Sequence, residues 1–192
     1  MSSSRPDDAQ ITGWALAAKA GDRAAAAAFI RATQHDVHRF LSHLADAGEV
    51  EDLGQETYLR AMRGLPRFDA RSSAKTWLLS IARRAAADHV RRAMRRPRLV
   101  AIADWETVAD ARAYTAGSGF DGDVLLRRLL AGLDPDRREA FVATQVLGLS
   151  YAEAAQVCGC PVGTIRSRVA RARADLVEAL LAAGHPRARR PS

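Results

Sequence analysis

The sequence predicts an all-α fold in which two small helical domains are joined by a flexible linker. Apolar residues recur every three or four positions through most of the chain, as expected for helices with one buried face. This periodicity stops over residues 98–122, where acidic residues and glycines gather. The 192-residue chain is thereby divided into two segments, each long enough to hold a hydrophobic core.

The charge of the chain indicates a polyanionic partner. The formal net charge is +7, and the isoelectric point is about 10.4. Two of the 29 basic residues are lysines, and the others are arginines. Arginine forms forked hydrogen bonds with phosphates, although a GC-rich genome would produce the same bias. Both explanations of the arginine content stay open at this point.

We expect a cytoplasmic protein with no membrane insertion, no metal and no cofactor. The N-terminus lacks the apolar segment of a secretory signal, and no apolar run approaches the roughly 20 residues of a membrane span. Cys158 and Cys160 are separated by one residue, which is a poor geometry for a disulfide between them, and no further metal ligands stand nearby. His35 and His38 have a spacing that could hold a metal, but solvated surface histidines are more frequent.

The first domain is predicted at residues 14–97, after a disordered N-terminus at residues 1–13. The apolar periodicity predicts helices at residues 11–20, 23–45, 50–63 and 73–96. Within the third of these helices, Asp52, Gln55 and Glu56 form an acidic and amide cluster on an otherwise basic protein. The cluster is either a solvated helix face near the positive N-terminal end or a docking surface for a basic partner.

The loop after the third helix contains a combination of residues that can capture an unstacked base. Gly64 and Pro66 discourage helix formation, and Phe68 stands between Arg67 and Arg71. An aromatic ring beside arginines is typical of single-strand binding. Alternatively, the ring of Phe68 fills the interior of the helical bundle.

The helix that follows carries seven arginines within sixteen residues, with little to offset them beyond Asp88. This density predicts a face that follows the phosphates of a nucleic acid. The seven residues are Arg83, Arg84, Arg91, Arg92, Arg95, Arg96 and Arg98.

A linker is expected at residues 98–122, with at most a weak helix at residues 105–114. The second domain is predicted at residues 123–182, and a basic tail follows at residues 183–192. Asp134 and Pro135 have the order of a helix N-cap and a first-turn proline. The second domain is thus expected to be a four-helix unit that ends in a helix-turn-helix.

The helix-turn-helix is predicted at residues 150–176. Ser150 and Glu153 have the spacing of a capping box, and Gly159 suits the end of the first short helix. The second helix has Ile165, Val169 and Leu176 on one side and polar residues on the others. This layout is typical of a DNA reader, and the alternative is a solvated basic helix in an ordinary bundle. The polar residues are Thr164, Arg166, Ser167, Arg168, Arg171 and Arg173.

Three segments of the chain together resemble bacterial RNA polymerase sigma factors of the extracytoplasmic-function (ECF) type, which belong to the sigma-70 family. The resemblance covers about residues 14–97 and 123–180, in the order of the family. It implies a sigma-2-like domain, a flexible linker and a sigma-4-like helix-turn-helix domain. The segments are EDLGQETYLRAMRGLPRF, SSAKTWLLSIARRAAADHVRR and LGLSYAEAAQVCGCPVGTIRSRVARAR.

The resemblance implies a protein, not an enzyme, that binds core RNA polymerase, directs it to promoters and promotes melting of the −10 element. The implied partners are the β′ and β subunits, promoter DNA and an anti-sigma factor. Asp52, Gln55 and Glu56 match the positions that dock on the β′ coiled coil. The positions implied for −10 DNA are Arg67, Phe68, Arg71, Lys75, Arg84, Arg91, Arg92 and Arg95. Those implied for the −35 element are Thr164, Arg166, Ser167, Arg168 and Arg171.

Two departures from the family pattern affect these expectations. Gly54 stands within a helix where a larger residue is more usual, and Arg84 stands where asparagine is frequent. Two other classes of function also stay open. One is a repressor or activator that binds DNA by itself, and the other is a recombinase or nuclease subunit with Ser72 or Tyr58 as nucleophile.

Overall fold

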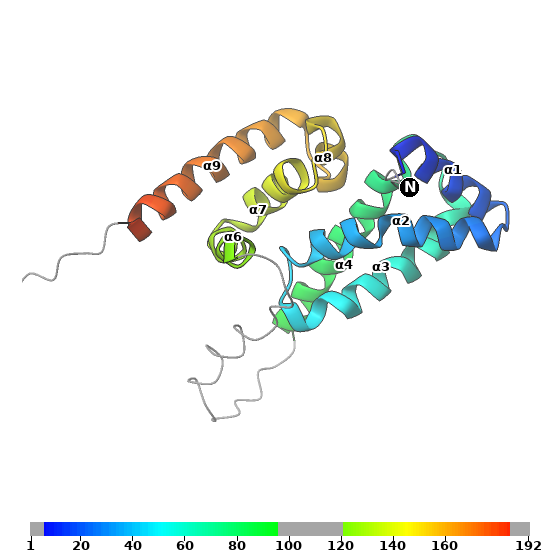
Figure 1. Cartoon of the computed structure of the whole chain (residues 1–192), viewed down its shortest axis with the longest axis horizontal. Helices are drawn as coiled ribbons and strands as arrows, with labels where there is room; N and C mark the ends of the chain where they lie inside the picture. Colours follow the sequence, from blue (N-terminus) through cyan, green and yellow to red (C-terminus); the bar gives the residue numbers. More distant parts are fainter. Residues whose placement is uncertain (1–5, 96–120, 185–192) are drawn as a thin grey trace, which may run out of the picture.

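The computed structural model of the chain describes residues 6–95 and 121–184 (Figure 1). These residues form helices and turns, with no strand among them, so the prediction of an all-α fold is confirmed. The predicted weak helix at residues 105–114 and the greater part of the basic tail lie outside the described residues.

The first four helices form a bundle in which α2 and α4 each contact the other three helices. The core contains large side chains that are fully buried, among them Phe29, Phe40, Leu41, Leu78 and Leu79. The helices are α1 (Asp8–Lys19), α2 (Arg23–Leu41), α3 (Val50–Gly64) and α4 (Ala74–Arg95), with 3-10 turns at Ala47–Glu49 (η1) and Leu65–Arg67 (η2).

The structure corrects two predicted boundaries in this domain. Helix α1 begins at Asp8, so the prediction of a disordered N-terminus is wrong for residues 8–13. The carboxylate of Asp7 caps this helix, and Ile11 is only 3% exposed because it packs into the core. Helix α2 ends at Leu41 instead of residue 45, since the backbone N–H groups of His43 and Leu44 donate to carbonyls three residues back.

The second domain is the predicted four-helix unit. Asp134 caps α7 with two backbone hydrogen bonds, and Pro135 is its first residue. A π-helical turn at Val142–Val146 (η4) follows α7, which the sequence pattern did not predict. The helices are α6 (Asp121–Ala131), α7 (Pro135–Phe141), α8 (Tyr151–Cys158) and α9 (Val162–Gly184), so both ends extend two residues past the predicted limits.

The two domains contact each other through α4 and α8. Beside this contact, Arg83 Nε of α4 donates a hydrogen bond of 2.5 Å to Glu139 Oε2 of α7. Burial raises the pKa of the Glu139 carboxyl, against the opposing effect of the Arg83 hydrogen bond. Arg83 therefore joins the two domains, although the sequence placed it in a phosphate-binding face.

We expect Arg83→Ala to weaken the contact between the domains. The carboxylate of Glu139 would lose its partner while its side chain stays mostly buried, and separation of the domains would return it to water. Small-angle X-ray scattering should show a larger radius of gyration for this variant. Arg84→Ala, which removes an exposed arginine at the adjacent position, should leave the radius unchanged. Equal radii for both variants would contradict this expectation.

We also expect Gly54→Ala to stabilise the first domain by about 0.5–1 kcal/mol, because alanine is the better helix former. Apart from the adjacent residues and the backbone of α3 itself, no heavy atom lies within 4 Å of the Cβ that alanine would add. Thermal unfolding followed by circular dichroism measures the gain. Gly159→Ala is the matched control: its φ of +64° is left-handed, so the same change should cost about 1–2 kcal/mol in the second domain.

Candidate nucleic-acid interface

The helix-turn-helix has the geometry that the sequence predicts. The hydroxyl of Ser150 accepts a hydrogen bond of 3.2 Å from the Glu153 backbone, and the Glu153 carboxylate accepts one of 2.8 Å from the Ser150 backbone. Gly159 ends α8 in a left-handed conformation. The buried side chains of Ile165 and Val169 then attach α9 to the domain.

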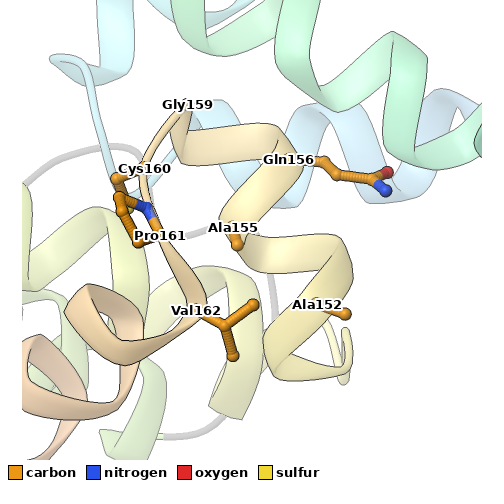
Figure 2. Close-up of a pocket in the computed structure, with 7 residues that line it drawn as sticks. All are labelled: Ala152, Ala155, Gln156, Gly159, Cys160, Pro161 and Val162. Atoms are coloured by element: carbon orange, nitrogen blue, oxygen red, sulfur yellow. The ribbon is translucent and has the colours of Figure 1, made fainter.

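Figure 2 shows a shallow hollow between α8 and the start of α9. Ala155 and Val162 border it, and Gln156 points away from the turn. The lining contains no titratable side chain other than the thiol of Cys160. This hollow therefore marks the turn of the helix-turn-helix, with that thiol as its single titratable group.

Two arginines on the outer face of α9 have neither an ion pair nor a side-chain hydrogen bond among the described residues, whereas the exposed Arg173 donates to Gln145. Arg166 and Arg171 are exposed, as is Ser167, whose hydroxyl donates to the Thr164 carbonyl. Thr164 is half-buried beside them. Arg168 differs from these four predicted residues, because its guanidinium forms an ion pair with Asp136 of α7.

The arginines of α4 divide into two groups. Arg84, Arg91 and Arg92 are exposed, whereas Arg83 is used between the domains. Asp88 accepts from Arg91 at 2.5 Å and from Arg60 of α3 at 2.7 Å, and these two hydrogen bonds lower its pKa. The side chains of Arg95, Arg96 and Arg98 lie outside the described part of the chain.

The loop before α4 presents its arginines and buries its aromatic ring. Arg67 and Arg71 are exposed, while Phe68 is 3% exposed. Its ring centroid lies 4.8 Å from that of Trp77, and its carbonyl accepts a hydrogen bond of 2.7 Å from Lys19 Nζ. The structure therefore favours the alternative in which Phe68 fills the bundle, since a ring enclosed in this way cannot stack on a base.

Lys75 is also directed into the domain. Its ammonium Nζ lies 3.3 Å from Asp36 Oδ2 and 3.8 Å from Asp8 Oδ1, and its side chain is 16% exposed. An ammonium held between two carboxylates supports the packing of α4 on α1 and α2. Lys75 thus helps to hold the first helical bundle together.

The acidic cluster of α3 borders an apolar groove. Asp52 and Gln55 are exposed, and Glu56 is paired with Arg60 at 2.7 Å, which lowers the pKa of Glu56. A groove with a volume of about 770 Å³ lies between α2 and α3, and Gln55 is part of its wall. Its apolar lining comes from Ile30, Val37, Val50, Leu59 and Met62.

Sequence reasoning missed this groove. The available signal was Leu59, which is 53% exposed and lies apart from the buried stripe of Leu53 and Thr57. An exposed leucine beside acidic residues is a typical composition for a protein-binding surface.

The described residues include no group of three histidine, cysteine, aspartate or glutamate side chains that could hold a metal ion. Burial raises the pKa of the Cys158 thiol to about 12, so this group stays protonated at neutral pH. None of the helices described here is long and apolar enough to cross a membrane.

The two helical domains, together with the exposed arginines on the helix-turn-helix, place this chain in the class of two-domain helix-turn-helix proteins. Residues 29–96 match the family model for sigma-70 region 2, and residues 123–176 match that for sigma-70 region 4. The chain therefore belongs to the sigma-70 family, and its relatives place it among the ECF RNA polymerase sigma factors. It acts with RNA polymerase in promoter-specific transcription initiation, as the resemblance predicted.

One such relative is the ECF RNA polymerase sigma factor SigC of Mycobacterium tuberculosis, which is 52% identical over 97% of both chains. Among solved structures, CnrH in complex with the cytosolic domain of CnrY is 26% identical, with a TM-score of 0.68 over 93% of this chain and 100% of CnrH. The sigma factor RpoE in complex with the anti-sigma factor NepR, from Bartonella quintana, is 30% identical, with a TM-score of 0.62 over 79% of this chain and 93% of RpoE.

Proposed function

We propose that this chain docks on core polymerase through α3, reads the −35 element with α9 and holds the melted −10 element with α4 and the loop before it. The observation that carries the proposal is the exposed pair Arg166 and Arg171 on a helix-turn-helix, without a carboxylate partner among the described residues. Unpaired guanidinium groups suit phosphates and guanine edges in the major groove.

We propose fewer residues for the −10 contacts than the resemblance implies. The exposed residues Arg67, Arg71, Arg84, Arg91 and Arg92 remain in the set, and Arg95 remains on the family pattern alone. Phe68 and Lys75 instead shape the loop and the start of α4. Melting requires no covalent step, because bases that unstack spontaneously can be captured and held.

The core-binding surface that we propose combines the acidic cluster with the groove. Asp52, Gln55 and Glu56 supply charge and hydrogen bonding, and the apolar wall beside Leu59 supplies buried area. A basic helical partner would find both charge complementarity and an apolar contact there. We assign this surface to the β′ subunit and the helix-turn-helix domain to the vicinity of the β subunit.

The same reasoning extends to a regulator and to location. We propose that an anti-sigma factor binds this chain, on the basis of the named complex of RpoE with NepR. Since polymerase and promoter DNA are its partners, we place the chain in the cytoplasm.

Sigma factors are not enzymes, and we propose no catalytic step for this chain either. Of the two candidate nucleophiles, Tyr58 hydrogen-bonds to Thr33 at 2.8 Å, and burial raises the pKa of Tyr58 to about 12. A phenol with that pKa is a weak nucleophile at neutral pH. Incubation of the chain with labelled supercoiled DNA should produce no nicks, and nicking would revive the recombinase alternative.

We expect Asp52→Arg combined with Gln55→Ala to abolish assembly with core polymerase in a pull-down. The change places a positive charge where a basic partner is proposed to dock and removes a polar group from the groove wall. Asp69→Arg with Arg71→Ala, on an exposed loop of the same domain, is the matched control and should keep assembly intact. Normal assembly by the first variant would refute the docking surface.

We expect Arg171→Ala to reduce run-off transcription from a promoter selected with the wild-type holoenzyme by about 10-fold or more, while core binding stays unchanged. The lost guanidinium would remove about 1–3 kcal/mol of base discrimination. A pull-down with core and a transcription assay on the same preparation separate the two effects. Equal loss of both would indicate a folding defect instead of lost readout.

A further inference from the structure

Arg168 uses its guanidinium within the second domain. Nη2 donates to Asp136 Oδ2 of α7, and Nη1 lies 3.6 Å from Cys160 Sγ in the turn before α9. The side chain is only 22% exposed. Two of its three nitrogens are thus engaged with neighbouring elements, in contrast to Arg166 and Arg171 on the same helix.

Two more polar contacts join α9 to the preceding elements. Arg137 Nη1 of α7 donates to Asp175 Oδ2 at 2.6 Å, and Arg173 Nη2 donates to Gln145 Oε1 of η4 at 2.8 Å. Together with the Arg168 ion pair, they hold the middle of α9, from Arg168 to Asp175. Helix α9 donates to α7 through Arg168, and α7 donates to α9 through Arg137. The two contacts together fix one register of the two helices.

The apolar contacts of α9 do not fix its rotation by themselves. Ile165, Val169, Ala172 and Leu176 are buried in one stripe, and apolar burial is non-directional. Charge-assisted hydrogen bonds are directional. With about 3.6 residues per turn, Arg168 lies on the flank between this stripe and the exposed Ser167. Because a hydrogen bond at that flank is stretched when α9 turns about its axis, it opposes rotation of the helix.

We propose that Arg168 is a positioning residue for promoter recognition, which orients α9 through Asp136 and does not itself contact DNA. The proposal rests on the −35 role proposed for α9. A rotation of about 20° would move a side-chain group that lies about 6 Å from the helix axis by about 2 Å, which exceeds the range of hydrogen-bond distances. The Asp136–Arg168 pair therefore determines whether Arg166 and Arg171 reach their contacts.

The decisive variant is Asp136→Asn, assembled with core polymerase on a promoter fragment selected with the wild-type holoenzyme. Removing a negative charge near DNA should strengthen binding if only electrostatics matter. If Asp136 orients Arg168, the preference for the selected −35 element over a scrambled one should instead fall by about 10-fold. Asp136 is about half-exposed, so this variant should fold, and circular dichroism checks that it does.

Arg168→Gln and Arg171→Gln are compared in the same assay over a range of salt concentrations. Loss of a phosphate contact reduces the slope of log K against log salt by about 1. We expect that reduction for Arg171→Gln, whereas Arg168→Gln should lower specificity with an unchanged slope. The double variant Asp136→Asn with Arg168→Gln should be no worse than either single variant, because the two residues act as a unit.

Three results would overturn the proposal. The first is tighter or equal binding by Asp136→Asn with unchanged specificity. The others are a slope of log K against log salt that is reduced by about 1 in Arg168→Gln, and additive losses in the double variant. Arg171→Gln separates this failure from failure of the −35 role. If Arg171→Gln leaves both specificity and slope unchanged, α9 does not read DNA and the positioning proposal falls with it. If Arg168→Gln fails to fold, Arg168→Lys retains the charge without the fork and takes its place.

Discussion

The pairing of arginines with carboxylates inside the fold is the constraint on which the rest of this structure depends. A chain with 22 acidic residues and a net charge of +7 cannot neutralise all its arginines. Arg60, Arg83, Arg137 and Arg168 form ion pairs that join helices or domains. The guanidinium groups left without such partners face solvent on α4 and α9. Arginines that join the fold and exposed arginines that we propose to contact DNA are therefore distinguished by their neighbours, because the side chain is the same.

The same division applies to the aromatic and aliphatic groups. Phe68 packs on Trp77 and supports a loop whose arginines are exposed, so its ring belongs to the core and not to the proposed DNA-binding surface. Leu59 shows the converse case, since it leaves the core and borders a groove beside the acidic cluster. Apolar exposure next to charge gives that part of α3 the composition of a protein-binding surface.

Helices α4 and α9, on which we propose the DNA contacts, belong to different domains that pack against each other. Helix α8 packs on α4, and the Arg83–Glu139 hydrogen bond lies beside this interface. Within the second domain, α9 is held by its apolar stripe and by polar contacts with α7 and η4. The packing of α9 within its domain and of α8 on α4 together sets how the exposed arginines of α4 and α9 lie relative to each other.

Local sequence determined the helices, the capping box at Ser150 and the left-handed Gly159, because these features depend on residues within one or two turns. It also indicated the family, through three motifs in order. Only the tertiary structure decided that Arg83, Arg168 and Lys75 are internal, since their partners Glu139, Asp136 and Asp36 lie on other helices. A run of arginines predicts charge along a helix, but the partner of each guanidinium depends on how the helices pack.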